Sequence, residues 1–155
     1  MDITPLVQAV QTLNASDAFK PGLGAQHWQV LAPYLKRQSV RAGDRLIGQG
    51  DMDRCAYFLE QGNLQAYASG APPGNHRPSI LRPGSLVGEA GLFAELPRTA
   101  NVEAMTPCVV WVLSVARLDD LCAQAPALAL QLLRAAGAVM ALRAHEHRKR
   151  GLPLV

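Results

Sequence analysis

Between residues 38 and 113 the chain is a series of short apolar segments, interrupted every several residues by turn-forming residues. Turns are indicated by Ala42-Gly43-Asp44, Gly48-Gln49-Gly50-Asp51 and Glu60-Gln61-Gly62-Asn63. Short strands separated by such frequent turns indicate an antiparallel sandwich or barrel. Residues 69–78 are polar and rich in Pro and Gly, so we expect a hairpin loop there. The predicted strands cover residues 39–41, 45–47, 55–59, 64–68, 79–81, 99–102 and 108–113.

Two short helices are predicted before the first strand. Thr4 is a candidate N-cap, with Pro5 in the first turn of a helix whose apolar residues recur at helical spacing. Lys20-Pro21-Gly22 separates this helix from a second one, predicted at roughly Gly24 to Leu35. Both helices are expected to pack on the rest of the domain, and we assign them no chemistry.

The C-terminal part of the sequence predicts a helix from Ser114 or Val115 and a longer one from Pro126 towards Arg148. Between residues 126 and 142 its only polar side chains are Gln131 and Arg134. A helix that is apolar nearly all round is buried on more than one side, so its partners are expected to be the mouth of the β-structure and a second copy of the chain. Its apolar residues include Leu128, Leu132, Leu133, Val139 and Met140.

The basic residues at the end of this helix, from Arg143 to Arg150, have two possible interpretations. They could form a nucleic-acid patch, but positive charge at a helix C-terminus has a simpler electrostatic explanation. The formal charge of the chain is only +3. We therefore interpret these residues as a solvated helix end.

The stretch from Gly84 to Ala104 combines a loop, one short helical turn and a strand. Glu89 opens the turn, where an acidic residue suits the positive end of a helix. Free backbone N–H groups at such a start favour an anion, and Gly88 and Gly91 leave the backbone without side-chain cover. Arg98 follows the turn. One carboxylate and one guanidinium thus flank a bare helix start, which suits a ligand that carries a phosphate and sugar hydroxyls.

This spacing resembles the phosphate-binding cassette of the cyclic nucleotide-binding domain family, which occurs in catabolite-activator-type regulators, protein kinase A regulatory subunits and cyclic-nucleotide-gated channels. The matching motifs are Gly88-Glu89-Ala90-Gly91-Leu92 and Pro97-Arg98-Thr99-Ala100, and the resemblance covers roughly residues 24 to 145. It departs from the family pattern at Val87, where an aromatic residue is usual, and at Gly91, where Ala is common. Neither departure removes a polar contact.

The resemblance implies a role for each part of the cassette. Glu89 would accept a hydrogen bond from the ribose 2′-hydroxyl, Arg98 would hold the cyclic phosphate, and backbone amides near Gly88 to Gly91 would complete the cradle. If Arg98 has no other task, its replacement by Leu should spare the fold and weaken only ligand binding. The candidate ligand-binding residues are Val87, Gly88, Glu89, Ala90, Gly91, Arg98, Thr99 and Ala100.

The fold class expected from these observations is α+β, with an antiparallel, jelly-roll-like β-roll between N-terminal helices and a long C-terminal helix. At 155 residues and 49% apolar composition, a single domain with a substantial core is expected. We divide it into a helical segment (1–35), a roll (36–114) with its cassette (84–102), and C-terminal helices (115–150). In the family this last helix covers the base, moves when ligand binds, and often forms a dimer.

The function expected from the resemblance is that of a cytoplasmic sensor for a 3′,5′-cyclic mononucleotide. We expect cAMP, although Thr99 is compatible with either cAMP or cGMP, and the expected partners are a second copy and a downstream protein that the sequence does not identify. No cofactor is expected. The alternative is a degenerate fold that serves in dimerisation or docking, without nucleotide or with another anionic ligand. Because the chain ends at Val155, no helix-turn-helix and no sequence-specific DNA binding are expected.

An enzyme is not expected. A metal-binding β-roll needs several His and a Glu that converge on one ion, whereas the four histidines are dispersed, and no Ser-His-Asp order or Walker loop occurs. Three widely spaced cysteines in apolar sequence indicate buried thiols in a reducing cytoplasm. The start of the chain has no basic leader, and no membrane span is expected. The histidines are His27, His76, His145 and His147, and the cysteines are Cys55, Cys108 and Cys122.

Overall fold

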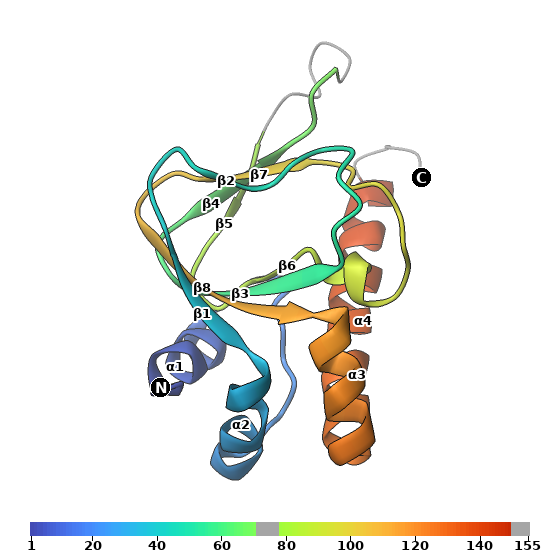
Figure 1. The fold of residues 1–155 in the computed structure, drawn as a ribbon. Helices are drawn as coiled ribbons and strands as arrows, with labels where there is room; N and C mark the ends of the chain where they lie inside the picture. Colours follow the sequence, from blue (N-terminus) through green and yellow to red (C-terminus); the bar gives the residue numbers. More distant parts are fainter. Residues whose placement is uncertain (71–77, 150–155) are drawn as a thin grey trace.

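The computed structural model of the protein describes residues 1–70 and 78–149, so most of the loop expected at 69–78 lies outside the described residues. The described strands form two four-stranded antiparallel sheets that face each other, which confirms the predicted β-roll (Figure 1). The strand orders are β1-β8-β3-β6 and β2-β7-β4-β5. The strands are β1 (Lys36–Val40), β2 (Arg45–Ile47), β3 (Cys55–Gln61), β4 (Leu64–Tyr67), β5 (Ser79–Leu81), β6 (Leu86–Val87), β7 (Asn101–Ala104) and β8 (Cys108–Ser114).

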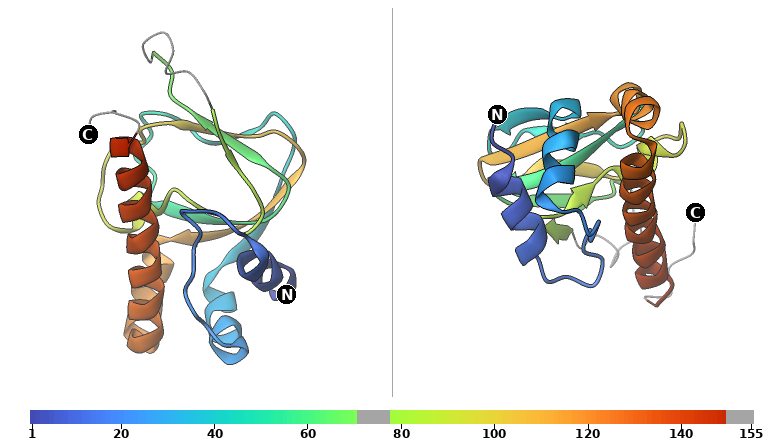
Figure 2. Two further views of the ribbon diagram at one scale, coloured as in Figure 1. Left: turned by 180° about the vertical axis from the view of Figure 1, so that it is seen from behind. Right: turned by 90° about the horizontal axis from the view of Figure 1, so that it is seen from below.

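The helices gather outside the sheet that contains β1, β3 and β8. Figures 1 and 2 show α1, α2 and α3 beyond this sheet, while α4 runs along one edge of the roll from the helical layer to the level of the other sheet. The predicted helix pairs at both ends of the chain are thus confirmed. The helices are α1 (Thr4–Thr12), α2 (Ala25–Leu31), η1 (Ala32–Tyr34), η2 (Glu89–Leu92), α3 (Val115–Gln124) and α4 (Pro126–Lys149).

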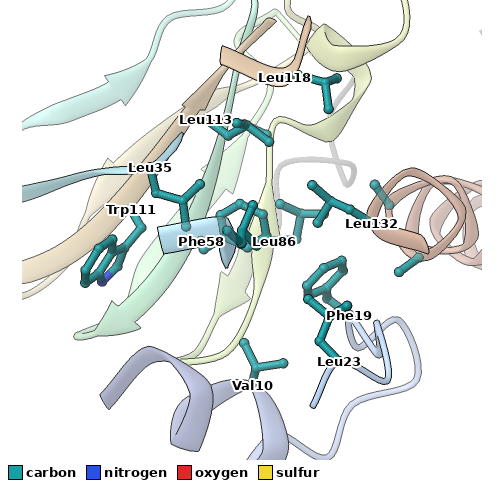
Figure 3. Close-up of a cluster of buried hydrophobic side chains, with 14 of the residues drawn as sticks. Val10, Phe19, Leu23, Leu35, Phe58, Leu86, Trp111, Leu113, Leu118 and Leu132 are labelled. Carbon is teal, nitrogen blue, oxygen red and sulfur yellow. The ribbon is translucent and has the colours of Figure 1, made fainter. Parts of the chain in front are cut away.

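Strand β8 separates two hydrophobic cores, because its alternate side chains point to opposite faces. Val110 is buried between the two sheets, whereas Trp111 and Leu113 are buried in the helical layer. In the helical layer, Figure 3 shows side chains of the sheet such as Phe58 meeting Phe19 and Leu132 of the surrounding segments. An apolar strand without alternation is therefore expected here, since both of its faces are covered.

Several of the predicted boundaries are wrong. Strand β1 begins at Lys36 and not at Ser39, and the short strand β6 was not predicted. Thr4 is the first residue of α1 and not its cap, and no side chain caps this helix from the N-cap position, which Ile3 occupies. Instead, the Thr4 backbone N–H donates to Asp2 Oδ1 at 2.9 Å. Strand β7 begins at Asn101 and not at Thr99, and the backbone of Arg98, just before the predicted start, is hydrogen-bonded to the loop between β2 and β3. Ser114 does cap α3, by accepting from the Arg117 backbone N–H at 3.2 Å.

The cysteines are less uniformly buried than expected. Cys108 is buried, but Cys55 and Cys122 are only half-buried. Partial burial raises the pKa of the Cys55 thiol, with the nearby Asp53 carboxylate as a second cause. The thiol therefore stays protonated near neutral pH, which makes it a poor nucleophile.

Helix α4 uses much of its apolar surface within its own chain. Leu128, Leu132 and Val139 are buried in the helical core, whereas Leu130 and Leu142 are exposed. By length and composition alone, residues 126–147 of this helix could also cross a membrane. A helix that packs in a core satisfies the same criterion, and α4 packs in one.

Candidate functional site

A cavity of about 1190 Å³ opens between the cassette, strand β5, the linker between α1 and α2, and the C-terminal end of α4. All eight residues that the sequence predicted as ligand-binding line this cavity. They belong to two segments, residues 87–91 and 98–100, which the fold brings together on one wall. Their contact with a ligand stays a prediction. The cavity is also lined by residues that the sequence did not predict as ligand-binding, among them Asp17, Arg82, Met140, Arg143 and Glu146.

The two glycines of the cassette make room for a side chain of the same cassette. Gly88 has a left-handed backbone (φ 74°) and precedes the turn of η2. A Cβ added at Gly88 would lie 3.1 Å from Arg98 Nη1, and one added at Gly91 would lie 3.0 Å from Arg98 Nη2. Larger residues would therefore press on the Arg98 guanidinium. The sequence predicted bare backbone at these glycines, and much of the space beside them holds Arg98.

Arg98 is bound tightly within the chain, so the expectation that it has no other task is wrong. Its side chain is 7% exposed, and it forms a forked ion pair with Asp53, with Nε and Nη2 donating to the two carboxylate oxygens at 2.9 and 2.8 Å. Nη1 donates to the Gly88 carbonyl at 2.8 Å, and Nη2 also donates to the Cys55 carbonyl. The hydrogen-bonded guanidinium holds the pKa of the Asp53 carboxyl below its ordinary range. Buried cations need such partners, and Arg98 has them within the described residues.

The backbone of Arg98 is fixed by the same loop that supplies Asp53. The Arg98 N–H donates to the Asp51 carbonyl, and the Gly50 N–H donates to the Arg98 carbonyl, both at 2.8 Å. The loop between β2 and β3 thus positions the backbone and the side chain of this arginine. Asp53 was missed by sequence reasoning because it lies 45 residues from Arg98, and no local pattern marks a turn aspartate as its partner.

Glu89 is held by a residue of α4. Its side chain is 8% exposed, and Oε2 accepts a hydrogen bond from Arg143 Nη1 at 2.8 Å. Arg143 also donates from Nε to Asp17 Oδ2 at 2.9 Å and from Nη2 to the Leu86 carbonyl at 2.7 Å. The interpretation of Arg143 as part of a solvated helix end is therefore wrong, because its side chain is only 27% exposed.

A signal for Arg143 was present in the sequence. It lies four residues after the buried Val139 and eleven after the buried Leu132, a spacing that keeps all three on one helix face. An arginine that continues the inward face of a helix differs from the exposed Lys149 beyond it.

The rest of the cassette carries little side-chain chemistry. Thr99 is exposed at the rim, and its hydroxyl forms no hydrogen bond with the described residues. Among residues 1–70 and 78–149, no group of three His, Cys, Asp or Glu side chains could hold a metal ion. The chemistry of the cavity thus rests on one buried carboxylate and one buried guanidinium at the wall, with Arg143 beside the carboxylate.

Residues 37–125, more than half of the chain, match the family described as the cyclic nucleotide-binding domain. The chain belongs to this family. It also superposes on a crystal structure of a cyclic nucleotide-binding domain from Methylobacillus flagellatus, with a TM-score of 0.81 and 19% identity. That superposition covers 96% of this chain and 81% of the other and establishes the likeness of the fold.

Two curated relatives contain a similar segment inside much longer proteins. The chain is 33% identical over 79 residues to the cAMP-dependent protein kinase regulatory subunit of Yarrowia lipolytica, which covers 51% of this chain and 20% of that protein. It is 35% identical over 85 residues to the acetyltransferase Pat of Mycolicibacterium smegmatis, which covers 53% of this chain and 24% of that protein. The chain therefore spans a quarter or less of these relatives.

Proposed function

We propose that the chain is a regulatory module that binds a 3′,5′-cyclic mononucleotide, with cAMP as the preferred ligand. The observation that carries this proposal is the convergence of the eight cassette residues on one cavity, with Glu89 and Arg98 both buried at its wall. Family membership and the similarity to subunits named as cAMP-dependent support the choice of ligand. The same observations favour binding over catalysis.

The phosphate and the ribose of the ligand would each find a complementary group. The cyclic phosphate would lie near Arg98 and the first backbone N–H groups of η2, which have no partner within the turn. A ribose hydroxyl would donate to Glu89 Oε1, which accepts no hydrogen bond from the described residues. Buried carboxylates are strong acceptors for such hydroxyls.

Arg98 has limited capacity for a phosphate while Asp53 is bound to it. A guanidinium has five N–H donors, and Arg98 uses four of them on Asp53, Gly88 and Cys55. One N–H of Nη1 is left for a phosphate oxygen. A forked bond to phosphate would require Asp53 to move away, so we expect phosphate binding to loosen the loop between β2 and β3.

Ligand binding is also expected to shift α4, because this helix contributes Met140, Arg143 and Glu146 to the cavity. The alternative function is a dimerisation or docking module without nucleotide. Buried, cavity-lining Glu89 and Arg98 argue against it, since nothing in a simple docking role needs a charged cavity.

The proposal is tested by calorimetric titration of the purified chain with cAMP and cGMP. Arg98→Leu should weaken binding at least tenfold, because each lost hydrogen bond to a charged group costs about 1.5–3 kcal/mol. Arg134→Leu is the matched control, since Arg134 is exposed on α4 and does not line the cavity. Since Arg98 also ties the cassette to Asp53, the variant is expected to melt at a lower temperature even without ligand.

The melting experiment separates the two roles of Arg98. Saturating cAMP should raise the melting temperature of the wild type and of Arg134→Leu, and it should raise that of Arg98→Leu much less. A wild type whose melting temperature does not respond to either nucleotide would refute the proposal in favour of the docking alternative. Tighter binding of cGMP than of cAMP would refute the choice of ligand alone.

A further inference from the structure

Arg143 joins two segments that are far apart in the sequence: the linker before α2, through Asp17, and the cassette, through Leu86 and Glu89. We propose that Arg143 is a positioning residue for ribose recognition. It fixes the Glu89 carboxylate so that Oε1 faces the cavity, and it thereby makes the end of α4 a part of the binding site. This inference rests on the proposed function and names the residue on which its ribose contact depends.

The geometry leaves one oxygen of Glu89 for a ligand. Arg143 occupies only Oε2, at 2.8 Å, and no described residue donates a hydrogen bond to Oε1. Glu89 lines the cavity although its side chain is only 8% exposed. A buried carboxylate that lines a cavity, with one oxygen held by an arginine and the other without a donor, is preorganised to accept a hydrogen bond from a hydroxyl, because little rotamer freedom is then lost on binding.

The contacts of Arg143 make it a rigid support. Each of its three nitrogens donates to a different acceptor, at distances between 2.7 and 2.9 Å. Two of these acceptors, the Asp17 carboxylate and the Leu86 carbonyl, do not belong to Glu89, so Arg143 keeps two hydrogen bonds even if the Glu89 side chain moves. Arg143 carries one positive charge and pairs with two carboxylates, those of Asp17 and Glu89. The group of three therefore keeps a net negative charge, which favours a hydroxyl that donates a hydrogen bond to Glu89.

A competing arrangement is that Arg143 blocks Glu89, so that the ribose must displace it. The anchoring of Arg143 by Asp17 and Leu86 argues against this, as does its use of a single Glu89 oxygen. The two arrangements predict opposite effects of removing Arg143. Removal of a support weakens binding, whereas removal of a competitor tightens it.

The experiment compares cAMP with 2′-deoxy-cAMP, which lacks only the hydroxyl in question. In the wild type, loss of this hydroxyl should weaken binding roughly tenfold or more, as is typical of a hydrogen bond to a charged group. In Arg143→Gln, cAMP should bind about tenfold more weakly while 2′-deoxy-cAMP changes little, so that the ratio of the two affinities falls towards one. Asp17→Asn should lower the ratio less, because it removes one anchor of Arg143 and not Arg143 itself.

The matched control is Arg134→Gln, which removes the same charge from an exposed position of the same helix and should keep the wild-type ratio. The ratio compares two ligands on one protein, so partial destabilisation of a variant largely cancels from it. Arg143→Lys tests whether a positive charge without the forked guanidinium is enough to keep the wild-type ratio. An unchanged ratio in Arg143→Gln, or tighter cAMP binding, would overturn the inference while the proposed function stands. Failure of the wild type to bind either nucleotide would overturn both.

Discussion

Asp53 lies in the loop between β2 and β3, and its carboxylate accepts both hydrogen bonds of the Arg98 fork. Only the Arg98 side of this ion pair is shielded from solvent, since the exposed fraction is 7% for the Arg98 side chain and 33% for that of Asp53. The contribution of this ion pair to the free energy of unfolding should therefore lie between that of an exposed pair and that of a buried pair. The pair decides how firmly Arg98 is held at the cavity wall.

Stability should depend on the protonation of Asp53 in the acid range. Because the pKa of Asp53 in the folded state is held below its ordinary value of 3.8, the pair stabilises the fold above about pH 4 and is lost as the pH falls through the lowered pKa. Asp53→Asn should thus be less stable than the wild type by about 1–2 kcal/mol at pH 7. Denaturant unfolding at several pH values should show the difference shrinking below pH 4.

The control for this prediction is Asp44→Asn in the preceding turn. Asp44 pairs with Arg41 at 3.5 Å, but both side chains are at least half exposed. Such pairs contribute little, so the variant should follow the wild-type profile. If the difference between Asp53→Asn and the wild type were the same at pH 3 and at pH 7, the ion pair could not be its source.

At the residue scale, the sequence predicts site residues that are close together in the chain, and it misses contact partners that are far apart in it. The cassette residues are close in the chain, and their resemblance to the family's cassette sufficed to select eight residues that all line one cavity. The partners of the two charged residues could not be read in this way. Asp53 and Arg143 lie 45 and 54 residues from Arg98 and Glu89, and only the packing of the loop and of α4 on the roll brings them together.

At the scale of elements, α4 differs most from its sequence-based description. Its length and start are as predicted. However, part of the apolar surface from which self-association was predicted is buried in the core of the same chain. Leu128, Leu132 and Val139 are buried, and the large apolar residues that α4 exposes among those described are Leu130 and Leu142. The pattern of a helix in sequence cannot distinguish burial in its own chain from burial against a second copy.

Self-association through α4 stays a prediction, and it now depends mainly on Leu130, which is 51% exposed. Burial of a leucine contributes about 1.5–3 kcal/mol, so Leu130→Glu should weaken a dimer at least tenfold. Sedimentation at micromolar concentration, with and without cAMP, measures this. Val30→Glu, which changes a similarly exposed residue on α2, should leave the dimer intact. A wild type that is strictly monomeric in both conditions would exclude this interface.

At the scale of the whole molecule, the linker between α1 and α2 is bound to α4 at two places. Arg143 pairs with Asp17, and Gln131 Nε2 donates to the Pro21 and Gly22 carbonyls at 2.8 and 3.2 Å. Between these contacts Phe19 packs on Phe58 of β3, with ring centroids 5.4 Å apart. The sequence predicted that the first helices pack on the domain. It could not predict that their linker would join the helix that lines the cavity.

The division into two cores determines what intrinsic tryptophan fluorescence can report about this protein. Both of its tryptophans, Trp28 and Trp111, are 2% exposed and belong to the core of the helical layer, and neither lines the cavity. A bound nucleotide therefore cannot quench them by contact. If intrinsic fluorescence changes when cAMP is added, the change must come from rearrangement of the helices around the indoles. Trp28 should be the more direct reporter, because it lies on α2 itself, whereas Trp111 lies on β8 and its indole N–H donates to Glu60 of β3 at 2.9 Å. The chain thus carries its own optical probe of helix movement, separate from ligand occupancy.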